Sequence, residues 1–281
     1  MLTRRTLSNG MKQSIRHQVV SMFNDSGKGE TPVSRSADAL FDIGSVAWRV
    51  HGDVASMMVG GISSLLMQML HPSVLAGVWD HSNFRADMHG RLRRTARFIA
   101  VTTYADRELA QASMARVRRV HDQISGTLPD GTAYHANDPR LLAWVHVTEA
   151  TSFLDAWIRY GEPTMSTADQ DQYFAEMALI GRAMGAAPVP TSRPEAGALI
   201  EEMRPQLRVD DRTRTVARLI MSSSATSLAA EVPRRLAVQA AVDLLPQWAR
   251  TMHRMNLSPL ERPIVRAGTF GIAQTLRWAF R

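Results

Sequence analysis

One uncharged stretch, residues 54–70, constrains the fold of this chain more than any other part of the sequence. A helix that crosses a bilayer needs about 20 apolar residues, and this stretch is shorter and contains serine, glycine and glutamine. We therefore predict a central helix that is buried on all sides. Gly60 and Gly61 each cost such a helix about 1 kcal/mol relative to alanine. Their presence predicts a close approach at this point by a flat group or by another backbone.

Helical periodicity and helix-end signals recur through the rest of the chain. Asp138 and Pro139 are suited to the capping and first positions of a long helix, and the pair Asp130 and Gly131 indicates a short hairpin. The sequence shows no series of strands, no phosphate-binding glycine loop and no internal repeat. We predict an all-α fold. Its helices are expected at residues 11–23, 36–50, 53–70, 73–79, 90–103, 106–125, 139–160, 166–186, 194–206, 211–229, 233–255 and 268–280.

The distribution of polar residues predicts the domain organisation. Residues 1–34 are expected to form a basic, flexible lead-in, which ends in a linker over residues 24–36 that is rich in glycine, serine and proline. The remainder, residues 35–281, is expected to form a single all-helical domain. No secretory signal peptide is visible, because the N-terminal stretch lacks an apolar segment of useful length. A cytoplasmic location is therefore expected.

Charge and cysteine content narrow the classes of function. The chain has no cysteine, which excludes disulfides, thiolate ligands and iron–sulfur clusters, and leaves histidine as the main ligand for iron or zinc. The net charge is +7, but the arginines are dispersed, so we expect no nucleic-acid partner. The basic surface and the amphipathic segment at residues 271–281 predict peripheral contact with an anionic membrane.

The histidines are unevenly distributed, since seven of the nine lie between His51 and His146. His121 has helical spacing with Met114, Val117 and Ile124, on an apolar side. Two interpretations are open for it. It is either a core histidine bonded to a backbone carbonyl, or an axial ligand to iron presented by a helix beside an apolar slot.

Arg91, Arg94 and Phe98 share one face of a predicted helix, and Thr95 lies next to it. Two guanidinium groups at a helix start oppose the helix macrodipole, which favours anions there. They either form a solvated face that pairs with nearby aspartates, or bind carboxylates such as haem propionates.

Two further histidines have positions that allow chemistry. His71 ends the buried stretch and precedes a proline, so it is expected to cap carbonyls, line a pocket or relay protons. His146 and Glu149 share a helix face, but a di-iron bundle needs further glutamates and a second matching pair, which are absent. The H-E-x-x-H motif of zinc hydrolases and the G-x-S-x-G motif of α/β-hydrolases are also absent.

A combination of short motifs resembles one known family. The motifs are Q-x-x-H-P at residues 68–72, R-x-x-[RK]-T at 91–95, H-x-x-[VI]-x-G at 121–126, Y-x-A-x-D-P at 134–139 and W-V-H at 144–146. Their order and spacing over residues 45–190 resemble the core of the latex-clearing protein (rubber oxygenase) and MpaB-like family. The combination is specific, although no single motif would suffice.

The resemblance implies an all-α, globin-reminiscent bundle around a central helix, and a bound haem b. It implies that His121 is the proximal iron ligand, and that Arg91 and Thr95 match the arginine and threonine of the distal helix. Arg94 stands where the rubber oxygenases have a lysine that can ligate iron, and a guanidinium has no free lone pair to replace it. The distal position is then open, holds water, or takes another ligand such as His71. His121, Arg91, Arg94 and His146 are expected to contact the cofactor, and Arg91, Arg94, Thr95 and His71 to act in catalysis.

These expectations predict a haem-dependent oxidoreductase that uses O2 on a lipophilic or small natural-product substrate. The alternative is a cofactor-free protein that keeps the family fold and binds a lipid or metabolite. The replacement of the family lysine by Arg94 is the main support for this alternative.

Overall fold

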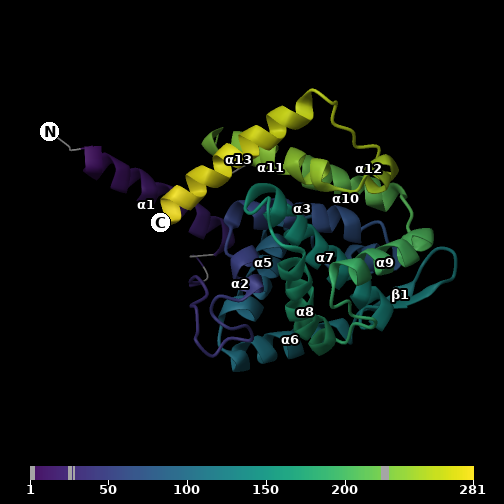
Figure 1. Ribbon diagram of the computed structural model, residues 1–281. Coiled ribbons are helices and arrows are strands. Elements are labelled where there is room, and N and C mark those ends of the chain that lie inside the picture. The colour runs from purple at the N-terminus through teal and green to yellow at the C-terminus, as the bar shows by residue number, and fades with distance from the viewer. Residues whose placement is uncertain (1–3, 25–26, 28, 223–227) are drawn as a thin grey trace.

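The computed structural model describes residues 4–24, 27, 29–222 and 228–281, and it confirms the all-α prediction (Figure 1). Its only sheet among these residues has two short strands. The elements are α1 (Arg4–Phe23), α2 (Val46–His51), α3 (Val54–Gln68), α4 (Pro72–His81), α5 (Met88–Tyr104), α6 (Arg107–His121), β1 (Ser125–Thr127), β2 (Ala133–His135), α7 (Pro139–Tyr160), α8 (Thr167–Met184), α9 (Arg193–Met203), η2 (Arg204–Gln206), α10 (Asp211–Ser222), α11 (Leu228–Leu244), α12 (Gln247–His253) and α13 (Glu261–Phe280).

The uncharged stretch forms the central helix α3, which packs along α7. Asp53 caps its N-terminus by accepting from the Ser56 backbone NH at 2.9 Å. The two helices touch at Gly60, where an added Cβ would lie 2.8 Å from the Ser152 carbonyl oxygen and 2.8 Å from a ring carbon of Phe153. The predicted close approach by another backbone is therefore confirmed.

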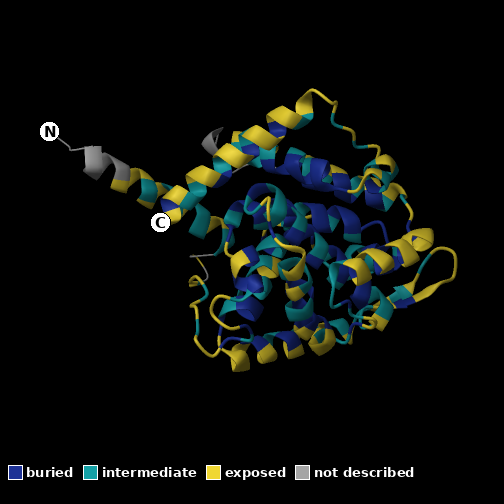
Figure 2. Cartoon of the chain, viewed as in Figure 1, coloured by how far each residue is buried: buried dark blue, intermediate teal, exposed yellow. Residues whose placement is uncertain are grey.

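Helices α11 and α13 form a layer on the other side of α3 (Figure 1). A small apolar core lies between this layer and the central pair, and α11 contributes Ala237, Ala240 and Ala241 to it. Their small side chains allow the helices to approach closely. Arg277 on α13 binds the N-cap of α3, with its Nε 2.7 Å from Asp53 Oδ2. Figure 2 shows buried residues in the centre of the molecule and exposed ones along the outer faces of α6 and α13.

The prediction of a helix at residues 36–50 was largely wrong. Only α2 forms, near the end of this range. The Ser36 NH donates to the Tyr104 carbonyl at 2.8 Å, and the Arg107 NH donates to the Asp38 carbonyl at 2.7 Å. These bonds hold the preceding segment, which consists of turns and bends, against the junction of α5 and α6. Gly44 has a φ of 94°, which ends any helix there, and Ser45 then caps α2.

Two predicted helices near the C-terminus also differ from the structure. The helix expected at residues 233–255 is divided into α11 and α12, because Pro246 lies between them without a backbone NH. The helix expected at residues 268–280 begins earlier, at Glu261. Residues 223–227 of the helix predicted at 211–229, and part of the linker predicted at 24–36, lie outside the described residues.

The two ends of the chain pack together. Helix α1, predicted only at residues 11–23, begins at Arg4 and contacts α13. The Lys12 ammonium lies 5.1 Å from the centre of the Trp278 ring, and the Arg16 guanidinium lies 6.0 Å from that of Phe280. Most of the basic lead-in is therefore a helix that packs on the domain.

No single described helix is long and apolar enough to cross a bilayer. Helices α3 and α4 reach the required length and composition only when they are taken together, and they are bent by 103° at the break between them.

Candidate functional site

His121 is the last residue of α6, because the chain turns there into the hairpin of β1 and β2. The structure therefore ends the helix earlier than the predicted residue 125. The hairpin itself was predicted, and Ser125 pairs with His135 in it. A backbone bond from the Ile124 NH to the His121 carbonyl, 3.0 Å long, makes the turn. His121 thus lies where a helix end, a turn and a hairpin meet.

The His121 imidazole is poised to act as a ligand. Its Nδ1 is buried and has no hydrogen-bond partner at normal distance, but the Asn137 side chain is close enough to act on the ring as a hydrogen-bonding group. Burial lowers the pKa of the ring, while Asn137 and Asp122 oppose that shift, so the ring is neutral at pH 7. A neutral imidazole that uses one ring nitrogen on Asn137 keeps the other for a metal, which is the chemistry that an iron ligand needs.

Asn137 holds the turn beside this ring. Its side-chain NH2 donates to the Arg118 carbonyl at 3.1 Å and to Asp122 Oδ1 at 2.6 Å, which ties the turn to the end of α6. Its own Oδ1 is buried without a partner. The His121 Nδ1 and the Asn137 Oδ1 therefore lie near each other, so Asn137 is suited to orient the ring.

Arg91 on α5 supplies a positive charge near His121. Burial, and then the charge of Arg94, lower the pKa of its guanidinium. The charge of Arg91 in turn lowers the pKa of His121, so the two side chains are within electrostatic reach. Within the described residues, no hydrogen bond or ion pair joins the Arg91 guanidinium to another group. A desolvated cation without a counterion suits a carboxylate ligand.

The structure places Arg94 and Thr95 on the exposed side of α5. Arg94 lies 3.5 Å from Asp87 Oδ2 and its side chain is 66% exposed. Thr95 donates to the Arg91 carbonyl at 3.2 Å, a bond within its own helix. Helical spacing predicted that Arg91, Arg94 and Phe98 share one face of α5. In the structure Arg91 and Phe98 are half-buried, whereas Arg94 is exposed. Catalytic roles for Arg94 and Thr95 stay predictions.

His71 is buried at the N-cap position of α4, without capping the helix through its side chain. Its Nε2 is 3.3 Å from Gln206 Oε1, and its Nδ1 has no partner. Burial lowers its pKa, although the Gln206 bond and the charge of Asp138 raise it. No contact with His121 is present, so a role in the distal position stays a prediction.

His146 is enclosed between α7 and α8. A Cβ added at Gly181 would lie 2.9 Å from its Nε2, which shows how closely α8 covers the ring. That Nε2 is buried without a partner, and burial lowers the pKa of the ring to about 4. The predicted contact of His146 with a cofactor stays untested, and the ring is packed against helix backbone.

A buried polar network beyond His146 was missed by the sequence analysis. His51 Nδ1 is 2.8 Å from Thr103 Oγ1, and His51 Nε2 is 2.9 Å from the Tyr173 hydroxyl. Because Thr103 already donates to the Ile99 carbonyl, His51 must donate to Thr103 through Nδ1 and accept from Tyr173. Burial lowers the pKa of His51 to about 3. These residues come from α2, α5 and α8, so no local spacing links them.

Glu149 lies near this network. Burial raises its pKa to about 7 from an ordinary value of 4.5. Its charge is among the causes that raise the pKa of Tyr173, after burial. Glu149 therefore keeps its proton in the folded chain over a pH range in which the unfolded chain loses it.

Glu149→Gln is expected to match the wild type in stability near pH 4.5 and to exceed it at pH 6.5. Between these values the folded wild type binds one proton more than the unfolded chain at this position, so its free energy of unfolding falls as pH rises. One pKa unit corresponds to about 1.4 kcal/mol, and the expected difference reaches about 2 kcal/mol at pH 6.5. Urea denaturation at pH 4.5, 5.5 and 6.5 measures it. A difference that does not change with pH would contradict a raised pKa.

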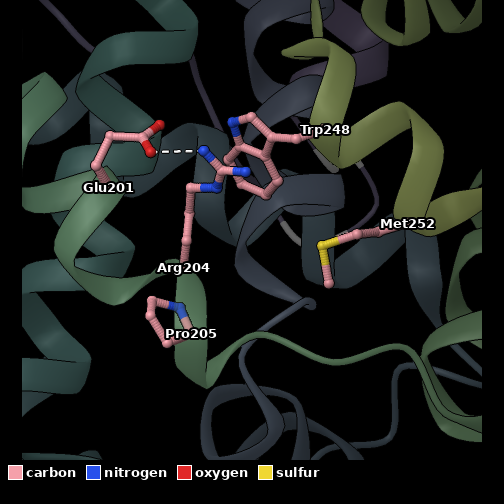
Figure 3. A pocket seen from close by; sticks show the side chains of 5 residues that line it. All are labelled: Glu201, Arg204, Pro205, Trp248 and Met252. Carbon is pink, nitrogen blue, oxygen red and sulfur yellow. Dashed lines mark hydrogen bonds and ion pairs between the residues drawn. The ribbon is translucent and has the colours of Figure 1, made fainter.

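A cavity that is not lined by His121 lies between α9, η2 and α12 (Figure 3). It has a volume of about 450 Å³ and is lined by Glu201, Arg204, Pro205, Trp248 and Met252. The Arg204 guanidinium stacks 5.0 Å from the centre of the Trp248 ring and pairs with Glu201 at 2.5 Å. A second cavity of about 30 Å³, beside Thr151 and Asp155, has room for about one water.

Among the described residues, no group of three or more histidine, aspartate and glutamate side chains is arranged to hold a metal ion. Of the predicted site residues, Arg91 lies within electrostatic reach of both His121 and Arg94.

Comparison with known proteins places the chain in a family. Residues 48–278 match the family model described as "ER-bound oxygenase mpaB/B'/Rubber oxygenase, catalytic domain". The match extends well beyond the core at residues 45–190 that carried the sequence motifs. Neither the curated proteins nor the solved structures give a significant match. Because the matched region covers most of the sequence, the chain belongs to the family of mpaB-type and rubber oxygenases.

Proposed function

We propose that this protein is a haem b-dependent oxygenase that acts on a lipophilic or small natural-product substrate. The family is one of oxygenase catalytic domains, which supports the use of O2 in general terms. The observation that carries the haem proposal is the half-buried His121 imidazole at the end of α6, next to the helix that carries Arg91. The imidazole is neutral and its Nδ1 is buried, and the half-buried Arg91 guanidinium on α5 has no counterion among the described residues.

The residues present fit the ligand role. His121 would hold the iron through a ring nitrogen, and its lowered pKa keeps that nitrogen free of a proton at neutral pH. Arg91 would pair with a haem propionate, which would give its charge the counterion that it lacks. Asn137, whose Oδ1 is unsatisfied beside the ring, would orient the imidazole.

Haem b, when bound, supplies the redox and O2 chemistry that the side chains of this chain lack. The other predicted residues have supporting roles in the proposal. His71 holds an unsatisfied Nδ1 in a buried position, where it would accept or release a proton. Arg94 and Thr95 would help to position the start of α5, on which Arg91 stands. His146 would support the site from α7 by packing against α8.

An absorption spectrum of the full chain, as purified and after addition of haemin, tests the proposal. We expect a Soret band with a one-to-one stoichiometry, and native mass spectrometry should show the mass increment of one haem. A chain that stays colourless and takes up no haem would overturn the proposal.

A second candidate function is cofactor-free binding of a lipid or metabolite. It is favoured by Arg94, which replaces the family lysine and is exposed and paired with Asp87. The same mass spectra distinguish the two functions, because this candidate predicts a heterogeneous set of small lipophilic adducts and no haem.

A cytoplasmic location with peripheral contact to an anionic membrane is also part of the proposal. Trp278 and Phe280 are partly exposed on α13, and Lys12 and Arg16 of α1 lie over their rings. Aromatic rings beside cations are typical of proteins that bind at a membrane surface. Flotation with anionic vesicles tests this contact, and Trp278→Ser should weaken it.

A further inference from the structure

Four arginines surround one buried carboxylate on the side of the molecule where α13 covers α11. The carboxylate belongs to Asp243, near the end of α11, and its side chain has no exposed surface. The arginines are Arg159 at the end of α7, Arg250 on α12, and Arg262 and Arg266 on the first turns of α13. We call these four residues the arginine cluster.

Two members bind the carboxylate directly. Arg266 donates from Nε to Asp243 Oδ2 at 2.6 Å and from Nη2 to Oδ1 at 3.2 Å, which is a bidentate pair. Arg159 donates from Nη1 to Oδ2 at 3.0 Å and to the backbone carbonyl of the same residue at 3.2 Å. Three of these bonds reach the carboxylate oxygens and occupy most of the acceptor positions of Asp243.

The other two members are left without a carboxylate of their own. Arg250 donates to the backbone carbonyls of Asp243 and Leu245, at 3.0 and 2.8 Å. Arg262 lies 3.7 Å from Asp243 Oδ1, beyond hydrogen-bond distance, and its buried Nε has no partner. In the part of the chain that the structure describes, none of the four has a second carboxylate at ion-pair distance.

The cluster therefore carries more positive than negative charge, four guanidinium groups around one carboxylate. The pKa of Arg250 responds to this excess. Burial lowers this pKa most, and the charge of Arg262 lowers it next. The charge of Asp243 raises it, whereas the charges of Arg159 and Arg266 lower it further. An uncompensated group of cations at a protein surface attracts anions.

A ligand from solvent has access to the cluster. The side chains of Arg159, Arg262 and Arg266 are 32%, 37% and 49% exposed. The buried Tyr160 hydroxyl lies beside the cluster, next to the Thr269 hydroxyl. The region thus combines excess positive charge with partly exposed guanidinium groups.

We propose that the arginine cluster is a binding site for a phosphate group, presented either by a soluble phosphate or by a lipid headgroup. The planar fork of a guanidinium matches phosphate oxygens in a bidentate manner. A phosphate dianion would offset most of the excess of three positive charges. Arg262, whose side chain is 37% exposed, would donate to it through its terminal guanidinium nitrogens, and Arg250 would add its charge.

Isothermal titration of the full chain with inorganic phosphate, at constant ionic strength set by chloride, tests the site. We expect saturable binding of one phosphate per chain. Arg262→Gln is the first variant, because its guanidinium makes no hydrogen bond whose loss would harm the fold. We expect it to weaken binding about tenfold or more, since a hydrogen bond to a charged group contributes at least that factor.

Arg218→Gln is the matched control, because it removes the same charge from an exposed arginine on α10 that bonds only within its own helix. It should leave phosphate binding unchanged. Arg159→Gln provides a second variant if Arg262→Gln fails to fold, and circular dichroism checks both. The absence of saturable binding to the wild type, or equal weakening in the cluster variants and in Arg218→Gln, would overturn the proposal.

Vesicles distinguish the two sources of phosphate. Phosphatidic acid presents a phosphomonoester at a lipid surface, and phosphatidylcholine vesicles serve as the control. Binding of the wild type but not of Arg262→Gln to phosphatidic acid vesicles would identify a lipid headgroup as the ligand. Binding of inorganic phosphate with no difference between the two proteins on vesicles would identify a soluble phosphate.

Discussion

His121→Ala is expected to lose the Soret band that haemin gives with the wild-type chain, and to bind haem at least about 100-fold more weakly. Loss even of an outer partner of a metal ligand typically costs about 10- to 100-fold in affinity, so loss of the ligand itself should cost no less. The reason lies in the state of this ring, which is neutral and half-buried, with its Nδ1 buried beside Asn137. Haemin titration followed by absorption measures the effect.

His89→Ala is the control for this experiment. His89 is exposed on the first turn of α5, close in sequence to Arg91, so its loss removes an imidazole without touching the proposed ligand. It should bind haemin as the wild type does. Equal haem affinity of His121→Ala and the wild type, with both proteins folded, would contradict the assignment of His121. Addition of imidazole should restore part of the band in His121→Ala, because free imidazole can enter the space that the side chain leaves.

Gly60→Ala is expected to lower the free energy of unfolding by about 3 kcal/mol or more, because it overpacks the contact between α3 and α7. Alanine is the better helix former by about 1 kcal/mol, so propensity alone predicts the opposite sign. The new Cβ, however, would lie 2.8 Å from the Ser152 carbonyl oxygen and 2.9 Å from the Phe153 Cα. These are backbone atoms of a buried helix, so the two helices must separate.

Gly61→Ala is the matched control in the next position of the same helix. Its Cβ would meet only a ring carbon of Phe153, at 3.7 Å, which is an ordinary contact. The variant should be as stable as the wild type or more stable by up to about 1 kcal/mol, from helix propensity. Urea denaturation of the wild type and both variants measures the difference. Similar stability of the two variants would contradict the close approach at Gly60.

Much of the helical framework could be predicted from local signals. The uncharged stretch predicted the central helix, and Asp138 caps α7 as its position suggested. The error at residues 36–50 had a non-local cause. Backbone bonds from this segment to Tyr104 and Arg107 replace the bonds that a helix would have made within itself. No periodicity within the segment could show those partners.

The candidate site was predictable in part. The sequence motifs identified His121 and Arg91. In the structure, the charge of Arg91 contributes to lowering the pKa of His121. The same motifs grouped Arg94 with Arg91, because residues three apart share a helix face. In the structure the two arginines differ in exposure. Arg91 is half-buried, whereas Arg94 is exposed and pairs with Asp87. Spacing along a helix defines a direction, whereas burial depends on which helices pack against that face.

The sequence by itself therefore determined the fold class, the central helix and the family. These follow from residues near each other in the chain, where hydrophobic pattern, capping and motif spacing act directly. Only the tertiary structure decided the network of His51 and Tyr173, and the gathering of Arg159 and Arg266 at Asp243. Arg159 and Asp243 are 84 positions apart. Their charges meet because α11 and α13 fold back over α3 and α7, and sequence spacing carries no information about that contact.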